Sequence, residues 1–285
     1  MNPYANLVAE YARHFRDGKG FPLGGFAPAP HPPVASGAPT ALIFSPHPDD
    51  ECIIGALPLR LRRESAWDIV NVAVTQGSNR ARQAGRLAEL REACHYIGFG
   101  LVQTAPNGLE KVTPQCRTDD PAHWQGMVQT IAAILATHRP RAIFFPHEHD
   151  WNGTHIGTHF LVMDALASLP ADFTTALVET EYWGQMTRPN LMVEVSAQDL
   201  TDQVTGTSFH VGEVRRNPFH LLLPAWMQDN VRRGSELVGG QGGAAPEFGF
   251  ATLYRQRIWH GGKVEEAFAG GRTLACGVDP AALFA

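Results

Sequence analysis

The sequence has no uninterrupted apolar run of about eighteen residues, the length that a membrane-spanning helix needs. Lysine and arginine cluster only in short pairs and the net charge is -5, so a general nucleic-acid binder is not expected. The four cysteines form no CxxC pair, which argues against a disulfide framework and a thiolate zinc site. The first forty residues lack the basic start and the apolar core of a signal peptide. We therefore expect a soluble, cytoplasmic protein that binds neither membranes nor nucleic acids.

Hydrophobic residues make up 44% of the 285 residues, which is enough to bury the core of one large domain. Residues 3–17 have the pattern of an amphipathic helix, whereas residues 21–40 are too rich in proline and glycine for a helix or a central strand. We expect residues 1–40 to form an arm and residues 41–285 to form a single domain. The arm either wraps its own domain, packs on a neighbouring subunit of a homo-oligomer, or is loosely attached, and the sequence leaves these alternatives open.

Beyond the arm, short apolar runs typical of buried strands alternate with helical patterns. The expected strands are 41–45, 68–75, 101–104, 141–146 and 176–183, and the expected helices lie near 52–64, 80–98, 122–138 and 155–168. This alternation predicts an α/β fold with a Rossmann-like, doubly wound, mostly parallel sheet and helices on both faces. Ligands of such sheets bind outside the carboxyl ends of the strands.

A C-terminal extension follows this pattern. NLMVEVS at 190–196 predicts a strand and residues 197–210 predict a helix. Residues 238–250 have four glycines within six positions, which indicates a loop or lid. No strand precedes these glycines, so they do not fit a dinucleotide-binding motif. We expect substrate-binding or lid elements within about 190–260.

The first charged cluster is SPHPDDECIIG, residues 45–55, where an apolar strand pattern changes into a helical one. Adjacent carboxylates repel each other unless a cation or a helix amino terminus stabilises them. His47 and Asp50 lie three residues apart, so both can bind one metal ion while Asp49 stays free to take up a proton. The alternative is a helix cap made by Asp49 or Asp50, with His47 exposed in a loop.

A second cluster, FFPHEHDWNGTHIGTH, carries four histidines directly after a buried strand pattern. A single histidine in such a turn is usually surface chemistry, but four beside one strand end favour a site. Thr154 resembles an N-cap, which places His155 in the first helical turn and His159 one turn later on the same face.

Three segments together resemble the LmbE-like, or PIG-L, family of zinc-dependent N-deacetylases. They are HPDDE at 47–51, RLAELREACHYIG at 86–98 and PHEHDWNGTHIGTH at 146–159. The resemblance covers residues 41 to about 165. It implies an enzyme that removes an N-acyl group, most simply acetyl, from an amino sugar such as N-acetylglucosamine or its conjugate.

Carried to this sequence, the resemblance implies that His47, Asp50 and His155 bind one Zn²⁺ per chain and that Asp49 is the general base. Two imidazoles and one carboxylate leave a coordination position open for water, as a catalytic zinc requires. The same ligand set also suits other divalent metals such as Fe²⁺. Zinc lowers the pKa of its bound water, and Asp49 would take the proton before attack on the amide.

The sequence departs from the family where a histidine usually precedes the last ligand, because Asn152 stands there. In the family that histidine is thought to polarise the carbonyl or protonate the leaving amine. An amide cannot release a proton at neutral pH, although Asn152 can donate a hydrogen bond to an oxyanion. The acid is then expected among His149, His159 and His210. His210 is a candidate catalytic residue because family members often carry a late histidine facing the site; otherwise it caps a helix.

Substrate contacts are harder to predict. Arg86 matches a family arginine that could contact substrate hydroxyls, although an ion pair with Glu89 is an equal alternative. We also predict substrate contacts for His149, Trp151 and His159. An apolar wall against a sugar face, or alternatively ordinary core packing, is expected for Trp151, Tyr182, Trp183 and Trp226.

Two further hypotheses use the same metal ligands. Two histidines and a carboxylate also describe non-haem iron oxygenases, but these have a different ligand spacing and a β-helical fold. The second hypothesis is a metal-binding homologue that has lost catalysis. Two departures from the family pattern favour it, namely Asn152 and the absence of a glutamate near Ser78. A Ser-His-Asp hydrolase is not favoured, since no GxSxG motif is present. Beyond an acylated small molecule, the sequence does not specify the substrate.

Overall fold

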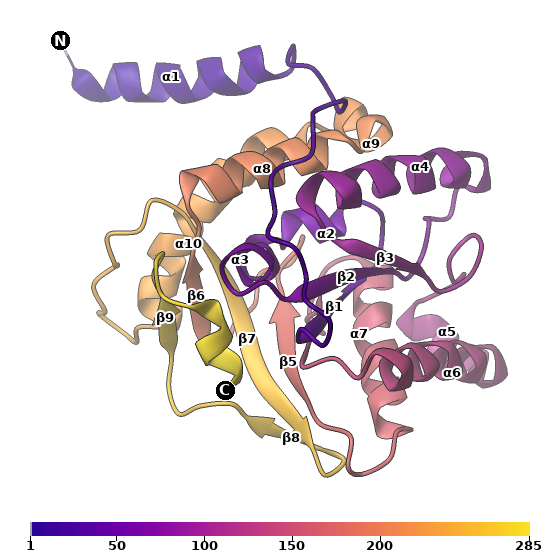
Figure 1. Ribbon diagram of the computed structural model, residues 1–285. Helices are drawn as coiled ribbons and strands as arrows, with labels where there is room; N and C mark the ends of the chain where they lie inside the picture. The colour runs from indigo at the N-terminus through magenta and orange to yellow at the C-terminus, as the bar shows by residue number, and fades with distance from the viewer. Residues whose placement is uncertain (1) are drawn as a thin grey trace.

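The computed structural model describes residues 2–285 and has a mostly parallel central sheet with helices on both faces (Figure 1). Its first half is parallel, in the order β3–β2–β1–β4–β5. These strands are β1 (Thr40–Ser45), β2 (Asp68–Ala73), β3 (Gly100–Gln103), β4 (Ala142–Pro146) and β5 (Thr175–Thr180). The strand β1 lies between β2 and β4, and five of its six residues are buried. The predicted Rossmann-like α/β fold is confirmed.

Successive residues of β1 enter different cores, because side chains alternate between the two faces of a strand. Ile43 belongs to one core, whereas Leu42 and Phe44 belong to the other. The first core is covered by α2 (Asp50–Ile53), α3 (Ala56–Glu64), α4 (Arg80–Ile97) and α8 (Ala197–Ser208). The second is covered by α5 (Pro114–Asp119), α6 (Pro121–His138) and α7 (Gly153–Ala167). Burial on both faces explains why these strands are continuously apolar.

The C-terminal part extends the sheet. The long strand β7 (Ala251–His260) pairs antiparallel with β5 and with β6 (Leu191–Glu194). Two short strands complete the sheet, β8 (Lys263–Glu266) beside β7 and β9 (Arg272–Leu274) beside β6. The remaining elements are α9 (Val211–Arg216), η1 (Phe219–Leu222), α10 (Leu223–Leu237) and η2 (Pro280–Phe284). The sequence analysis predicts β6, α8 and the loop at 238–250 but not β7, which follows that loop directly.

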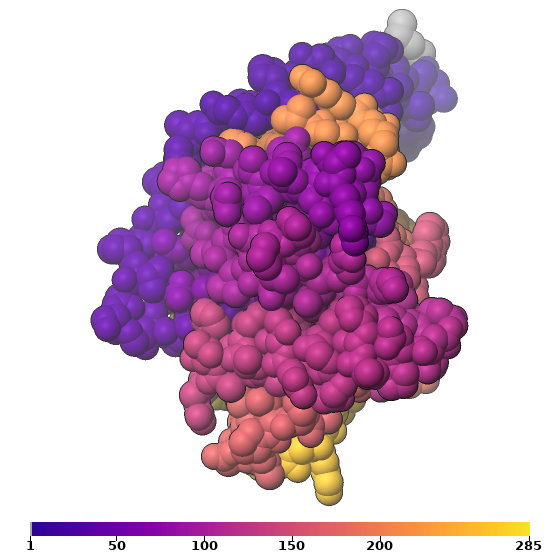
Figure 2. Space-filling model, turned by 90° about the vertical axis from the view of Figure 1, so that its right-hand side faces the viewer, coloured from indigo at the N-terminus to yellow at the C-terminus, as the bar shows by residue number. Residues whose placement is uncertain are grey.

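The N-terminal arm begins with α1 (Pro3–Gly18), which lies beyond α8 in Figure 1. The Tyr11 hydroxyl donates a hydrogen bond to Gln228 Oε1 in α10. Residues 21–39 contain no helix or strand, and the Ala29 N–H donates to the Tyr96 carbonyl at 3.2 Å. In Figure 2 the indigo arm runs from the top down one side of the molecule. Residues 21–39 therefore contact their own domain, whereas most residues of α1 are exposed.

Over the described residues 2–285, no helix combines the length and the apolar character needed to span a membrane.

A buried arginine ties the C-terminal extension to the core. The Arg60 side chain is fully buried in α3 and donates to both carboxylate oxygens of Glu64, at 2.7 and 3.0 Å. It also donates, over 2.9–3.5 Å, to the carbonyls of Glu194, Leu274, Ala275 and Val278. One guanidinium thus joins α3, β6 and the segment after β9, a role that its fork of donors allows and an ammonium does not.

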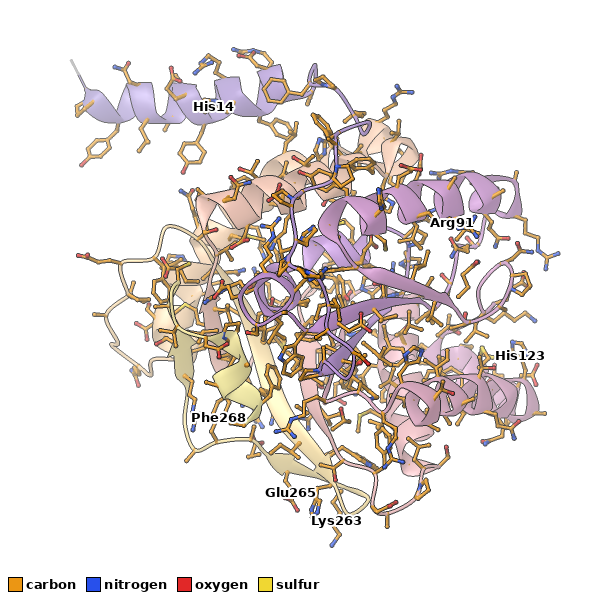
Figure 3. The ribbon with its side chains drawn as sticks, viewed as in Figure 1. His14, Arg91, His123, Lys263, Glu265 and Phe268 are labelled. Atoms are coloured by element: carbon orange, nitrogen blue, oxygen red, sulfur yellow. The ribbon has the colours of Figure 1, made fainter. Side chains whose placement is uncertain are left out.

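We predict that Arg60→Met lowers the free energy of unfolding by about 3 kcal/mol, because several buried carbonyls lose their donor together. Urea unfolding followed by circular dichroism measures this loss. The control is Arg91→Met on the exposed side of α4 (Figure 3), which should change stability by about 0.5 kcal/mol or less. Similar effects of the two substitutions would contradict the role of Arg60.

Candidate metal centre and active-site cleft

The two charged clusters meet at the carboxyl ends of neighbouring strands. β1 ends at Ser45, shortly before His47, and its partner β4 ends at Pro146, shortly before α7. His155 lies in the first turn of α7, and Asp50 begins α2. Because parallel strands end at the same edge of the sheet, residues about a hundred positions apart come together there.

The ligand atoms of His47, Asp50 and His155 form a compact triangle. His47 Nδ1 lies 3.2 Å from His155 Nε2 and 3.6 Å from Asp50 Oδ2, and His155 Nε2 lies 3.4 Å from Asp50 Oδ2. Donors about 2.0–2.1 Å from a tetrahedral zinc lie about 3.3–3.4 Å from one another. Asp50 and His155 are buried, whereas the His47 side chain is 19% exposed. The three residues therefore fit a divalent metal, with their open side toward solvent.

Asp150 lies beside the Nδ1 of His155, on the opposite side of the ring from the Nε2 that faces the triangle. Its Oδ2 lies 3.6 Å from His155 Nδ1 and accepts hydrogen bonds from the N–H groups of Trp183 and Gly184. A Cβ at Gly184 would lie 2.8 Å from the Asp150 Cα, so only glycine allows this approach. Burial alone would raise the pKa of Asp150, but the nearby His155 ring and hydrogen bonds from the backbone N–H groups of Asn152 and Gly184 bring it below its usual value. Asp150 was not predicted from the sequence. The one feature that could have indicated it is its position five residues before the proposed ligand His155.

Asp49 faces the cleft in a strained conformation. Its φ is 114°, in the left-handed region that only glycine adopts readily, and its N–H donates to Glu51 Oε2 at 3.0 Å. Asp49 precedes α2 but makes no side-chain capping bond, and Asp50 Oδ2 instead accepts the His47 N–H at 2.8 Å. The helix-cap alternative is therefore wrong. Burial and the neighbouring Asp50 hold the pKa of Asp49 well above its ordinary value, against the opposing charge of Arg86.

A cleft of about 240 Å³ opens beside Asp49 and His47. Its other lining residues are Ser78, Asn79, Arg82, Arg86, Asn152, Trp183, Glu213 and Arg216. A second hollow of about 400 Å³ shares His47 and Ser78 with it and is lined mainly by polar residues of 75–83 and 109–113. The metal triangle thus stands at the junction of two polar hollows.

Residues 42–166 match the family model PIG-L, described as GlcNAc-PI de-N-acetylase. This segment of the chain is similar to the PIG-L family. The match contains all three proposed metal ligands, Asp49, and the helix α4 with Arg86, and it confirms the resemblance inferred from the three motifs. No curated protein matches the sequence.

Solved structures share the fold of this chain at low identity. The N,N'-diacetylchitobiose deacetylase of Pyrococcus horikoshii has a TM-score of 0.56 at 13% identity, over 90% of this chain and 93% of that one. The A40926 pseudoaglycone deacetylase has 0.56 at 14%, over 78% and 97%. The 4-carboxy-2-hydroxymuconate hydratase of Pseudomonas putida has 0.57 at 12%, over 76% and 95%. At these identities the likeness shows the fold alone, and the fold carries more than one chemistry.

Asn152 lines the cleft, where the PIG-L family usually has a histidine. Its Oδ1 accepts the Thr154 N–H at 2.8 Å, so Asn152 caps α7 and the predicted N-cap at Thr154 is wrong. With Oδ1 engaged in the cap, the amide NH₂ is the group left for the cleft. Both residues are good capping types, and the sequence alone does not decide between them.

Arg86 lines the cleft as predicted, but its ionic partner is not Glu89. Its Nη2 donates to the Pro48 carbonyl at 3.0 Å, and its Nε lies 3.7 Å from Glu213. Glu213 also pairs with Arg82 at 2.5 Å and with Arg216 at 2.6 Å, whereas Glu89 accepts the Gly212 N–H. Sequence reasoning missed Glu213 because it comes from α9, far along the chain.

His210 is fully buried and does not line the cleft. Its Nε2 contacts Glu51 Oε1 at 2.7 Å, and the other oxygen of Glu51 holds the Asp49 backbone. This placement gives His210 a positioning role through Glu51 rather than contact with substrate. Glu51, Cys52 and His210 also lie close enough together to hold a metal ion, but all three are buried and Glu51 already has three hydrogen-bond partners.

The other three predicted contact residues lie away from the cleft. His149 has a 72% exposed side chain and lines a separate pocket with Glu148 and Arg188. Trp151 is 83% exposed. His159 is buried, with Nδ1 donating to the Pro146 carbonyl at 2.9 Å, so it supports β4. The structure does not place any of these three residues at the metal triangle.

Burial lowers the pKa of His159 from 6.5 to about 4, against the Pro146 carbonyl bond, which raises it. His159 therefore takes up a proton near pH 6.5 in the unfolded chain but only near pH 4 in the folded chain. We predict that stability falls as pH drops from 7 to 5, with about 2 kcal/mol of the loss due to His159. Urea unfolding of the metal-free protein at both pH values measures it. His159→Asn should lose correspondingly less stability; an equal loss in the variant would contradict the assignment.

Proposed function

We propose that the chain is a zinc-dependent hydrolase that removes an N-acyl group from an amino sugar or its conjugate. The observation that carries this proposal is the triangle of His47, Asp50 and His155, with a carboxylate outside it, Asp49, in the same cleft. A purely structural metal site would not need that carboxylate. The match of residues 42–166 to the PIG-L family model supports the same chemistry.

His47, Asp50 and His155 would hold the zinc ion, and Asp150 would keep the His155 ring in its binding orientation. When bound, zinc supplies an acidified water and a Lewis acid for the amide carbonyl. Asp49 accepts the proton of the attacking water. The Asn152 NH₂ donates a hydrogen bond to the carbonyl oxygen as it gains negative charge.

Asp49 is also the proposed source of the proton for the leaving amine. Among the residues that line the cleft, the one histidine is the ligand His47, and Glu213 is engaged with three arginines. Asp49 can therefore return the proton that it took from water, so one carboxylate serves both steps. Asp49 would thus take over the proton donation of the family histidine, at whose position this chain has Asn152.

The rest of the cleft suits a polar amine component. Arg82, Arg86 and Arg216 surround one buried carboxylate, Glu213, and leave guanidinium edges for hydroxyl or anionic groups.

The four cysteines are free thiols, which supports a reducing, cytoplasmic location. A homo-oligomer remains a proposal; α1 carries Tyr4, Leu7, Val8 and Tyr11 at 50–71% exposure.

An iron oxygenase is less well supported. The mostly parallel sheet with helices on both faces differs from the β-helical barrel of those enzymes. The Glu213 cluster and the two polar hollows suit a hydroxylated substrate of a hydrolase. This fit does not depend on which divalent metal is bound, so the metal is identified by measurement.

We predict that the purified protein binds about one zinc per chain and that Asp50→Ala loses it, because two imidazoles alone bind weakly. Elemental analysis after dialysis measures the metal content. The control is Asp68→Ala, which changes a partly buried residue at the start of β2 and should keep the metal. A zinc content unchanged by Asp50→Ala would contradict the ligand set, and stoichiometric iron would favour the oxygenase.

Asp49→Asn should keep the metal but lower kcat by about 10²–10⁴-fold, because the proton acceptor is lost while the ligands remain. Acetate release from N-acetyl amino sugars, together with metal analysis of the same samples, separates the two effects. A decrease of less than about ten-fold would show that Asp49 is not the base.

Asp150→Asn should weaken zinc binding by about 10–100-fold, since an amide holds the His155 N–H less strongly than a carboxylate. Competition with a chromophoric chelator gives the affinity. Asp164→Asn, an acid later in α7 that pairs with Arg117, is the matched control. Equal affinities of the Asp150 variant and the wild type would remove Asp150 from the site.

A further inference from the structure

An apolar pocket of about 200 Å³ lies directly beside the active-site cleft. It is lined by Ile53, Tyr182, Trp183, Phe219, Leu222, Leu223 and Trp226. These residues come from α2, from the segment after β5, from η1 and from α10. None of them carries a charge. Leu222 is 48% exposed and Trp183 is 40% exposed, so the pocket opens to solvent.

The apolar pocket adjoins the polar cleft at Trp183 and lies near the metal triangle. Trp183 lines both the apolar pocket and the polar cleft. Tyr182 packs edge-on against the ligand His155, with ring centroids 4.8 Å apart. Ile53 follows the ligand Asp50 by one helical turn in α2. The polar cleft and the apolar pocket therefore meet at Trp183, next to the metal triangle.

The two sides select different parts of a substrate. The polar cleft and the second hollow offer guanidinium, carboxylate, amide and hydroxyl groups, which suit a sugar or another hydroxylated amine. The apolar pocket offers hydrocarbon and aromatic faces, which gain from covering an apolar group and give nothing to a hydroxyl. Trp183 stands at the boundary, with its ring edge-on to Phe219 at 5.4 Å between centroids.

We propose that the apolar pocket receives the acyl chain of the substrate, so that the preferred substrate is an amide of an acid longer and more apolar than acetic acid. This inference rests on the proposed hydrolase function. Water adds to the acyl carbon, the C–N bond breaks, the amine takes a proton, and the carboxylic acid is released from the apolar pocket. The pocket of about 200 Å³ has room for more than the single methyl group of acetyl.

The test compares two substrate series with the zinc-loaded protein. The first varies the acyl group of glucosamine from acetyl through butanoyl and hexanoyl to octanoyl. The second keeps N-acetyl and changes the glycoside from methyl to octyl. We expect kcat/KM to rise roughly three- to four-fold for each methylene that the pocket covers. Cover for only three of the six additional methylenes of octanoyl already makes it about 30-fold better than acetyl. The glycoside series should vary by less than about three-fold.

Leu222→Glu places a charge at the mouth of the pocket and should reduce the octanoyl-to-acetyl ratio about ten-fold or more, because the acyl chain then contacts a carboxylate. The control is Leu237→Glu, another exposed leucine at the end of α10, which lines none of the described pockets and should keep the wild-type ratio. Calorimetric binding of the same amides to Asp49→Asn provides a second readout that needs no turnover. Affinity there should rise with acyl length and lose this dependence when Leu222→Glu is added.

Each alternative outcome has a distinct meaning. Equal rates for acetyl and octanoyl overturn the proposal, and a preference for octyl glycosides overturns it by placing the amine component in the pocket. A changed oligomeric state of Leu222→Glu with an unchanged ratio also overturns it, because the pocket is then a contact between copies. If no amide is hydrolysed but binding depends on acyl length through Leu222, the pocket assignment stands and the hydrolase function fails.

Discussion

The site depends on electron-rich groups that the fold forces together. Two imidazole nitrogens and a carboxylate oxygen lie 3.2–3.6 Å apart in a largely buried position. Burying such groups without a compensating charge is costly, and a divalent cation compensates all three at once. The surrounding features follow from this arrangement: Asp150 orients one imidazole, the backbone N–H of His47 holds Asp50, and Glu51 holds the strained backbone of Asp49.

The fold creates this meeting point through the neighbouring strands β1 and β4, whose carboxyl ends carry the two motifs. The C-terminal extension then builds the surroundings. α9 brings Glu213 to the arginines of α4, and η1 and α10 supply most of the apolar pocket. The PIG-L match ends at residue 166, so the three proposed metal ligands lie within it, whereas Glu213 and most residues of the apolar pocket lie outside it. Substrate choice can therefore differ between relatives that share the metal ligands.

Local patterns were sufficient to predict the parallel half of the sheet and the meeting of the two charged clusters that hold the proposed metal ligands. Continuous apolar strands and the HPDD spacing are properties of short segments, and the rule that strands end at one edge brings His47 and His155 together. The contacts of Glu51 with His210 and of Arg86 with Glu213 join distant segments, and no local pattern encodes them. β7 was missed because it follows a glycine-rich loop and lacks the continuous apolar run of the parallel strands. The choice of Asn152 over Thr154 as helix cap depends on backbone angles that two equally good capping residues do not reveal.

The most direct test of the central claim is zinc K-edge X-ray absorption of the protein loaded with one zinc per chain. The account predicts a first shell of nitrogen and oxygen at about 2.0–2.1 Å, with the multiple-scattering signature of two imidazoles. A sulfur neighbour at about 2.3 Å would contradict it, because the metal would then occupy the buried cluster of Glu51, Cys52 and His210 instead of the triangle at the cleft.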